Sequence, residues 1–105
     1  MSRVILHRKV TDDLNNILKY LNEQRSGLGN RFADAAMETM ERLAELPGMG
    51  SPKRFRLRHL QGARSWAVAG FRSYLIIYKA VEGGILVFGV LHGARRLGSV
   101  LRDRT

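Results

Sequence analysis

The chain has 105 residues, of which 45% are hydrophobic, and it carries a formal net charge of +9 from eighteen Lys and Arg against nine Asp and Glu. This length and apolar content predict one ordered domain over residues 1–105 and exclude a disordered tail. The sequence contains no cysteine, which excludes disulfides and thiolate metal sites. The apolar run in residues 1–7 is too short for a signal peptide, and the longest apolar runs are too short to span a bilayer. We therefore expect a cytoplasmic protein without membrane association.

The beginning of the chain predicts a strand and a helix. Residues 4–7 form a short apolar run that is typical of a strand. Thr11 stands at the position of a helix N-cap, and Asp12 and Asp13 follow in the first turn, where the helix dipole favours negative charge. Apolar residues then recur at helical spacing as far as Leu21. This first helix is expected to bury one apolar stripe.

A second helix is expected over residues 30–46, after a break at the glycines in residues 27–29. Residues 47–52 contain two prolines and two glycines and end that helix, because neither residue type continues it. Two helices joined by a short glycine link predict a helical hairpin.

The second half of the chain predicts mainly strands. Residues 53–60 alternate basic and apolar side chains, which is typical of a strand or an extended loop that is basic on one side. Gly89 indicates a bulge or a close backbone approach inside the last strand. Strands are expected at residues 64–69, 72–78 and 85–91, with turns at residues 61–63, at Gly70 and at residues 81–84, and a short closing helix at residues 97–102.

The predicted fold is therefore α+β, with the order β-α-α-β-β-β. A helical hairpin is expected to pack on a mainly antiparallel four-stranded sheet, followed by a short C-terminal segment. Residues 72–78 are apolar on both faces, which places their strand at the centre of the sheet.

The charge is segregated along the chain. Residues 11–45 carry more acids than bases, whereas residues 46–81 carry bases and no acid. Most of the cations are arginines, whose planar fork suits phosphate and carboxylate groups. This pattern predicts an anionic partner, which is either nucleic acid or an acidic protein.

Known catalytic and cofactor motifs are absent from the sequence. It has no glycine motif for nucleotides or phosphates and no serine in a nucleophile elbow. His7, His59 and His92 lack the spacing of metal ligands. We therefore expect no metal and no cofactor.

One set of residues suits metal-free cleavage of RNA. His92 can transfer a proton and Arg72 can stabilise phosphate charge, but a second proton-transfer group is not evident near them. The structural alternative is that His92 is hydrogen-bonded to backbone at the end of its strand. For Tyr74, Tyr78 and Trp66, core packing is favoured over base stacking, because each lies in an apolar strand.

Several short motifs recur in a familiar order along nearly the whole chain. They are Asp12-Asp13-Leu14 with Ile17, Tyr20 and Leu21; Leu43, Leu46, Pro47 and Gly50; Tyr74, Leu75, Ile76 and Tyr78; and Val90-Leu91-His92-Gly93 with Arg95. Their order and spacing resemble the RelE/ParE superfamily of toxins from bacterial toxin–antitoxin modules. The chain is more similar to ParE than to RelE, since it lacks the late aromatic residue of the RelE pattern after His92.

The resemblance implies a non-catalytic toxin that inhibits DNA gyrase by binding. It also implies a ParD-like antitoxin with an acidic C-terminal region, which neutralises the toxin in a heterotetramer or larger complex. One alternative is a ribosome-dependent mRNA endoribonuclease of the RelE type, with Arg72 and His92 as catalytic residues. Another is an inactive binding module or a relic of a plasmid-stabilisation system.

Two binding surfaces are expected on this interpretation. The target-binding surface comprises His92, Arg95, Arg96 and Arg102. The antitoxin-binding surface comprises Lys53, Arg54, Arg56 and Arg58. A partner helix with acidic residues and apolar anchors is expected to lie beside the helical hairpin and to complement this basic run.

Overall fold

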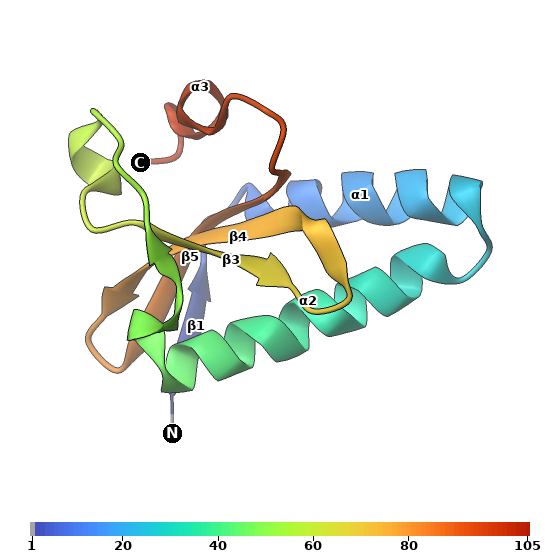
Figure 1. Cartoon of the computed structure of the whole chain (residues 1–105), viewed down its shortest axis with the longest axis horizontal. Coiled ribbons are helices and arrows are strands. Elements are labelled where there is room, and N and C mark those ends of the chain that lie inside the picture. The colour runs from blue at the N-terminus through green and yellow to red at the C-terminus, as the bar shows by residue number, and fades with distance from the viewer. Residues whose placement is uncertain (1) are drawn as a thin grey trace.

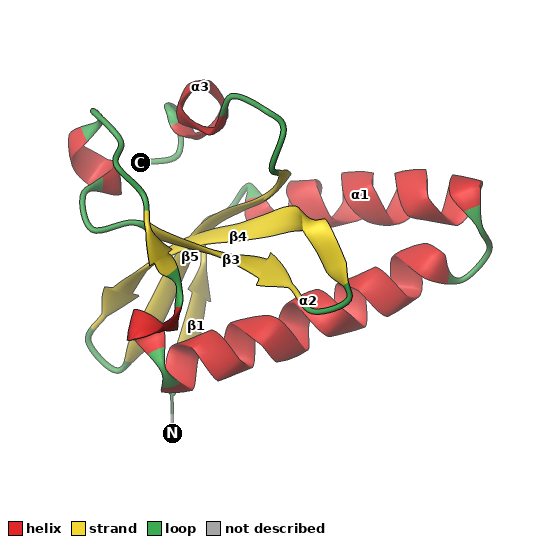
Figure 2. Ribbon diagram, viewed as in Figure 1, coloured by secondary structure: helices red, strands yellow, loops and turns green. Residues whose placement is uncertain are grey.

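The computed structural model describes residues 2–105, so Met1, the first residue of the run considered as a signal peptide, lies outside the described residues. The helices are α1 (Val10–Gln24), α2 (Leu28–Glu45) and α3 (Leu97–Leu101), and the strands are β1 (Arg3–Leu6), β2 (Ser51–Pro52), β3 (Arg64–Val68), β4 (Phe71–Val81) and β5 (Gly84–His92). The hairpin of α1 and α2 packs on the sheet (Figure 1). Figure 2 shows α3 beside the loop that precedes β3, away from α2. Within residues 2–105, no helix is long and apolar enough to cross a membrane.

The strands of residues 2–105 form one mixed sheet in the order β1-β5-β4-β3-β2. β1 runs parallel to β5, and the other neighbouring pairs are antiparallel. The α+β class and the central place of β4 are confirmed. The sheet is mainly antiparallel, as predicted, but the predicted number of four strands is wrong, because the observed mixed sheet has a fifth strand. A parallel pair needs a long crossover, which the helical hairpin and the later strands supply.

The fifth strand is β2, which lies in the segment predicted only to stop the second helix. Ser51 pairs with Ser65 and Pro52 with Arg64 at the edge of the sheet, where a proline is tolerated. Residues 53–57 continue as an extended loop and residues 58–60 form a 3₁₀ turn. Of the two structures expected for residues 53–60, the extended loop is therefore correct for residues 53–57, whereas the 3₁₀ turn at residues 58–60 was not predicted.

The first helix begins at Val10, with Lys9 as its N-cap, so the predicted cap at Thr11 is wrong. His7 satisfies the amides at this end of the helix. Its Nδ1 accepts a hydrogen bond from Lys9 N at 3.1 Å, and its carbonyl accepts one from Val10 N at 2.9 Å. Because His7 satisfies these two donors, they need no hydroxyl cap.

Gly29 lies inside α2 rather than in the break between the helices. Its backbone approaches α1 so closely that a Cβ at this position would overlap the carbonyl of Leu18. The amide of Gly29 also donates to Asn22 Oδ1 at 2.7 Å. The helical hairpin is confirmed, but its link covers residues 25–27 and so lies earlier in the chain than the glycine pattern predicts.

The two faces of the sheet have separate hydrophobic cores. On one face, Phe32 and Met40 of α2 pack with Ile76 and Tyr78 of β4. On the other face, the residues that pack together are Leu60, Ala63, Ile77, Phe88, Leu91 and Leu101, with Phe55, Leu57, Leu75, Leu86, Leu97 and Val100 partly buried against them. The C-terminal helix and the loop before β3 therefore cover the face opposite the helical hairpin.

The predicted core role of the aromatic residues holds for Tyr78 and Tyr74 but not for Trp66. Tyr78 is fully buried, and its hydroxyl donates to the Pro47 carbonyl at 2.7 Å and accepts from Gly50 N at 2.8 Å. Tyr74 packs against the first core. Trp66 is 39% exposed, and it follows the two residues of β3 that pair with β2.

A buried ion pair ties the C-terminal end of the chain to the sheet. Arg104 Nη2 lies 2.8 Å from Asp13 Oδ1, and Arg104 Nη1 contacts Asp13 Oδ2 and donates to the Phe88 carbonyl at 3.0 Å. A register shift in β5 marks the bulge predicted at Gly89. A Cβ on Gly89 would lie 2.6 Å from Arg104 Nη1, so the guanidinium fits only because this residue is glycine.

We expect Arg104→Ala to lower the free energy of unfolding by about 3–5 kcal/mol, because it leaves the Asp13 carboxylate buried without its cation. Urea denaturation measures this loss. The matched control is Arg102→Ala, an exposed arginine whose removal should change stability by no more than about 0.5 kcal/mol. In a double-mutant cycle with Asp13→Ala, additive losses would contradict a coupled pair.

His7 predicts a pH dependence of stability. Burial lowers the pKa of His7, with the backbone of Thr105 opposing the shift. Since the folded state favours the neutral ring, His7 supports stability above its unfolded pKa and loses that contribution as the pH falls below it. Between about pH 7 and pH 5, His7→Gln should flatten the fall in unfolding free energy measured by urea titration. A slope unchanged in His7→Gln but flattened in His92→Gln would contradict this assignment.

Candidate functional site: a basic groove

The basic segment, residues 53–57, is anchored by its alternate apolar side chains. Phe55 and Leu57 are half-buried in the second core, while Lys53, Arg54 and Arg56 are exposed. The amide of Lys53 donates to the Ala63 carbonyl at 2.9 Å. The alternation in the sequence therefore turns its cations outward even though the segment is not a strand.

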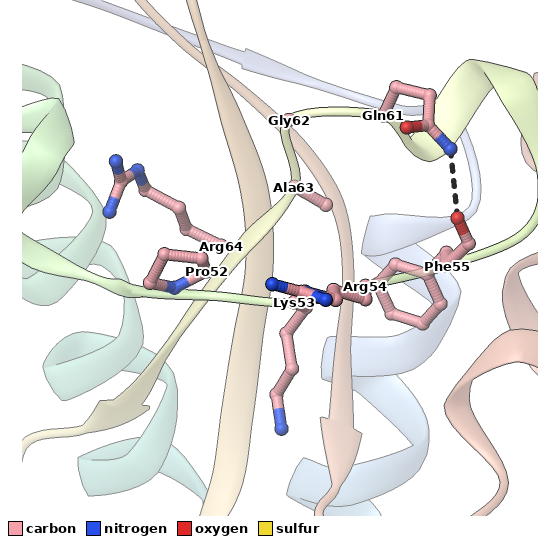
Figure 3. Close-up of a pocket in the computed structure, with 8 residues that line it drawn as sticks. All are labelled: Pro52, Lys53, Arg54, Phe55, Gln61, Gly62, Ala63 and Arg64. Carbon is pink, nitrogen blue, oxygen red and sulfur yellow. Dashed lines mark hydrogen bonds between the residues drawn. The ribbon is translucent and has the colours of Figure 1, made fainter.

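The loop that follows holds the basic segment in place. Gln61 Nε2 donates to the Phe55 carbonyl at 2.8 Å, as Figure 3 shows. Around these residues and Lys53, a hollow of about 480 Å³ opens toward β3. Arg64 lines this hollow, but its Nη1 donates to the Gly50 carbonyl at 2.7 Å. Part of the hydrogen-bonding capacity of Arg64 is therefore used inside the fold.

The C-terminal helix forms the opposite wall of a second hollow. Leu97 and Leu101 pack on the second core, and His59 Nε2 lies 3.1 Å from the Leu101 carbonyl. Gly98 faces Phe55 of the basic segment. A Cβ at this position would lie 3.8 Å from the Phe55 ring, which is an ordinary van der Waals contact. Arg102 follows and is exposed.

These two walls enclose a groove of about 560 Å³. The groove is lined by Lys53, Arg54, Phe55, Arg56, Leu57, Leu97, Gly98, Ser99 and Arg102. The groove brings together Lys53, Arg54 and Arg56, which are expected to bind the antitoxin, and Arg102, which is expected to bind the target. Arg58 does not line it and lies exposed in the neighbouring turn.

His92 is exposed at the end of β5 and organises a turn over residues 92–95, the His92 turn. Its Nδ1 accepts a hydrogen bond from Ala94 N, and its carbonyl accepts one from Arg95 N, each at 3.1 Å. The ring packs edge-on against Tyr74, with 5.3 Å between ring centroids. His92 is therefore hydrogen-bonded to backbone at the end of its strand, which is the structural alternative to a catalytic role for this histidine.

The other cations of the predicted surfaces are exposed but lie outside the groove. Arg95 lines a small cavity of about 100 Å³ with His92 and Tyr74, and Arg96 follows it. Arg72 is exposed near the start of β4, whose Tyr74 pairs with His92. Burial raises the pKa of the Tyr74 hydroxyl, with a smaller contribution from Tyr20, so this phenol keeps its proton and is a weaker proton donor than a free tyrosine.

Sequence reasoning identified the cations of the groove and missed its apolar residues. Phe55 and Leu57 alternate with the cations in the sequence. This alternation is the signal that could have predicted that they form the apolar floor of the groove. Leu97 and Gly98 lie at least 40 residues further along the chain, so no local pattern connects them to that floor.

The fold and groove define a small basic α+β protein with a helical hairpin on one face of its sheet and a cationic groove on the other. Residues 4–97 match the family described as ParE toxin of the type II toxin–antitoxin system parDE. The chain therefore belongs to the ParE toxin family. No curated protein matches it.

A solved structure described as the chromosomal ParDE toxin–antitoxin system from P. aeruginosa is similar in fold. It shares 13% sequence identity at a TM-score of 0.70, over 88% of this chain and 96% of the solved one. At this identity the similarity concerns the fold alone. The predicted resemblance to ParE is confirmed by the family match.

We expect His92→Ala to loosen the His92 turn without unfolding the protein. The lost hydrogen bond from Ala94 and the lost contact with Tyr74 should cost about 1 kcal/mol of stability. Amide exchange of Ala94 and Arg95 should accelerate, whereas exchange in the centre of β4 should not. Unchanged exchange at Ala94 in His92→Ala would contradict a structural role.

Proposed function

We propose that the protein inhibits DNA gyrase by binding it and that a ParD-like antitoxin neutralises it in the cytoplasm. Membership of the ParE toxin family is the observation that carries this proposal. The exposed arginines of the C-terminal region agree with it, because a non-catalytic inhibitor needs a docking surface rather than a proton-transfer pair.

The proposed target surface consists of His92, Arg95, Arg96 and Arg102. His92 would hold the turn that presents Arg95 and Arg96, and Arg102 would extend the cationic surface into the groove. Exposed arginines of this kind act mainly through association rate and orientation. Carboxylates or phosphates on a gyrase–DNA complex are the groups that their planar forks suit.

The proposed antitoxin surface consists of Lys53, Arg54, Arg56 and Arg58. Phe55 and Leu57 of this segment pack on the face of the sheet opposite the helical hairpin, so a partner helix beside the hairpin would complement the basic run only around an edge of the sheet. A partner that touches both faces must pass around an edge of the sheet. Binding of several copies in a heterotetramer or larger complex belongs to the same proposal.

The ribonuclease alternative has less support from the geometry. His92 Nδ1 already accepts a hydrogen bond from backbone, and burial raises the pKa of neighbouring Tyr74. Asp13, the carboxylate near this cavity, is bonded to Arg104. None of these groups is a free partner for His92 in acid–base catalysis.

A supercoiling assay with purified gyrase tests the proposal. The protein should inhibit supercoiling at stoichiometric excess, and Arg95→Ala/Arg96→Ala should raise the concentration needed by at least about tenfold, since these cations dock the target. The matched control is Arg25→Ala/Arg31→Ala, which removes two exposed arginines of the helical hairpin.

Supercoiling activity that stays unchanged when the protein is in stoichiometric excess over gyrase would contradict the gyrase proposal. Codon-positioned cleavage of reporter mRNA on ribosomes, abolished by Arg72→Ala and His92→Ala, would replace it with the ribonuclease.

A further inference from the structure

A small cavity lies between the first half of α1 and the His92 turn. Its volume is about 100 Å³, and its polar lining residues are Asp13, Asn16, Tyr74, His92 and Arg95. Pockets for whole small molecules usually measure roughly 300–1,000 Å³, so this cavity admits one compact chemical group of a ligand. The lining residues come from α1, β4, β5 and the turn after β5.

His92 offers an N–H group to a ligand at this cavity. Its Nδ1 accepts a hydrogen bond from Ala94 N at 3.1 Å, so Nδ1 carries no proton. A neutral imidazole has one protonated nitrogen, which here is Nε2. The side chain is exposed, and its ring packs edge-on against Tyr74. The structural role of His92 in its turn therefore leaves Nε2–H available as a hydrogen-bond donor.

Further donors line the same cavity on other elements. The Tyr74 hydroxyl keeps its proton, because burial raises its pKa, and it can donate a hydrogen bond without giving that proton up. Asn16 is exposed on α1 and brings a side-chain amide. Arg95 brings a guanidinium, and no carboxylate of residues 2–105 lies within ion-pair distance of it.

The carboxylate that lines the cavity is already neutralised by the fold. Asp13 is buried and paired with Arg104, and its Oδ2 also accepts a hydrogen bond from Val90 N at 3.1 Å. The charge of Arg95 has no such partner in the described chain. The cavity therefore combines several hydrogen-bond donors with an unbalanced positive charge, and this combination attracts an anion.

We propose that this cavity binds one phosphate group. Its donors belong to different elements, so they reach a ligand from different sides rather than in one plane. A phosphate group presents its oxygens in tetrahedral directions and uses such donors more fully than a planar carboxylate does. The fork of Arg95 can bond two of these oxygens at once, while Nε2 of His92 and the Tyr74 hydroxyl serve the others.

On the proposed function, the phosphate group belongs to the backbone of DNA bound to gyrase. His92 and Arg95 are part of the proposed target surface, and the cavity gives that surface one specific contact besides its general positive charge. This step rests on the proposed function, whereas phosphate binding by the isolated protein does not.

Titration of the full-length protein with inorganic phosphate, followed by amide NMR at constant ionic strength, tests the site. The amides of Gly93 and Ala94 should shift in a saturable manner, and chloride at equal ionic strength should not shift them. Arg95→Ala should weaken phosphate binding by at least about fivefold, because the bidentate fork is lost. The matched control is Arg25→Ala, which removes an exposed arginine at the other end of α1 and should leave the affinity within about twofold.

Variants without a charge change separate the cavity from general charge attraction. Asn16→Leu removes an amide donor and should weaken phosphate binding by about fivefold. Asn15→Leu is its control, because Asn15 is the exposed neighbour on the same helix and does not line the cavity. Tyr74→Phe keeps the ring and removes only the hydroxyl, so it should weaken binding several-fold. Circular dichroism on each variant shows whether the fold is retained.

Equal phosphate binding by wild type and Asn16→Leu would overturn the inference, as would acetate that binds as tightly as phosphate. The DNA step is read separately. A short DNA duplex should cause the same amide shifts in the wild-type protein and lose them in Arg95→Ala, and shifts with inorganic phosphate alone would refute DNA as the source of the group. If the protein does not inhibit gyrase at all, the proposed function fails while the phosphate titration still decides the site.

Discussion

The buried pair of Asp13 and Arg104 joins three parts of the chain that are distant in sequence: the first turn of α1, the bulge of β5 and the C-terminal residues. Desolvating two charges is costly, and the cost is met only where further hydrogen bonds complete the geometry. Here Asp13 Oδ2 also accepts from Val90 N at 3.1 Å, and Arg104 also donates to the Phe88 carbonyl. These two backbone groups flank Gly89, so the ion pair is hydrogen-bonded to the backbone on both sides of the bulge.

The groove depends on this pair. Leu101 is fully buried on the second core only three residues before Arg104, and α3 has just five residues. A helix of that length has little stability of its own, so its position comes from tertiary contacts. The ion pair holds the chain after α3 against the sheet, and α3 in turn provides one wall of the groove. The buried ion pair and the apolar contacts of Leu97 and Leu101 thus act together to position the wall that carries Arg102.

Local patterns in the sequence predicted the α+β class, the helical hairpin, the central strand and the bulge at Gly89, because each depends on neighbouring residues. The parallel β1–β5 pair and the two-residue strand β2 were missed, since both arise from pairing between distant segments. Asp13 shows the same limit for a single residue. Its place in the first helical turn predicts a dipole role, but its partner lies 91 positions away.

The candidate site was also predicted from the sequence only in part. Its cations are visible in the sequence as an acid-free run, whereas its shape requires residues 53–57 and 97–102 to meet on one face of the sheet. The groove therefore exists only while α3 is docked, and a ligand that bridges both walls binds the docked state alone. By mass action, such a ligand stabilises the docked C-terminal segment by an amount that grows with its concentration.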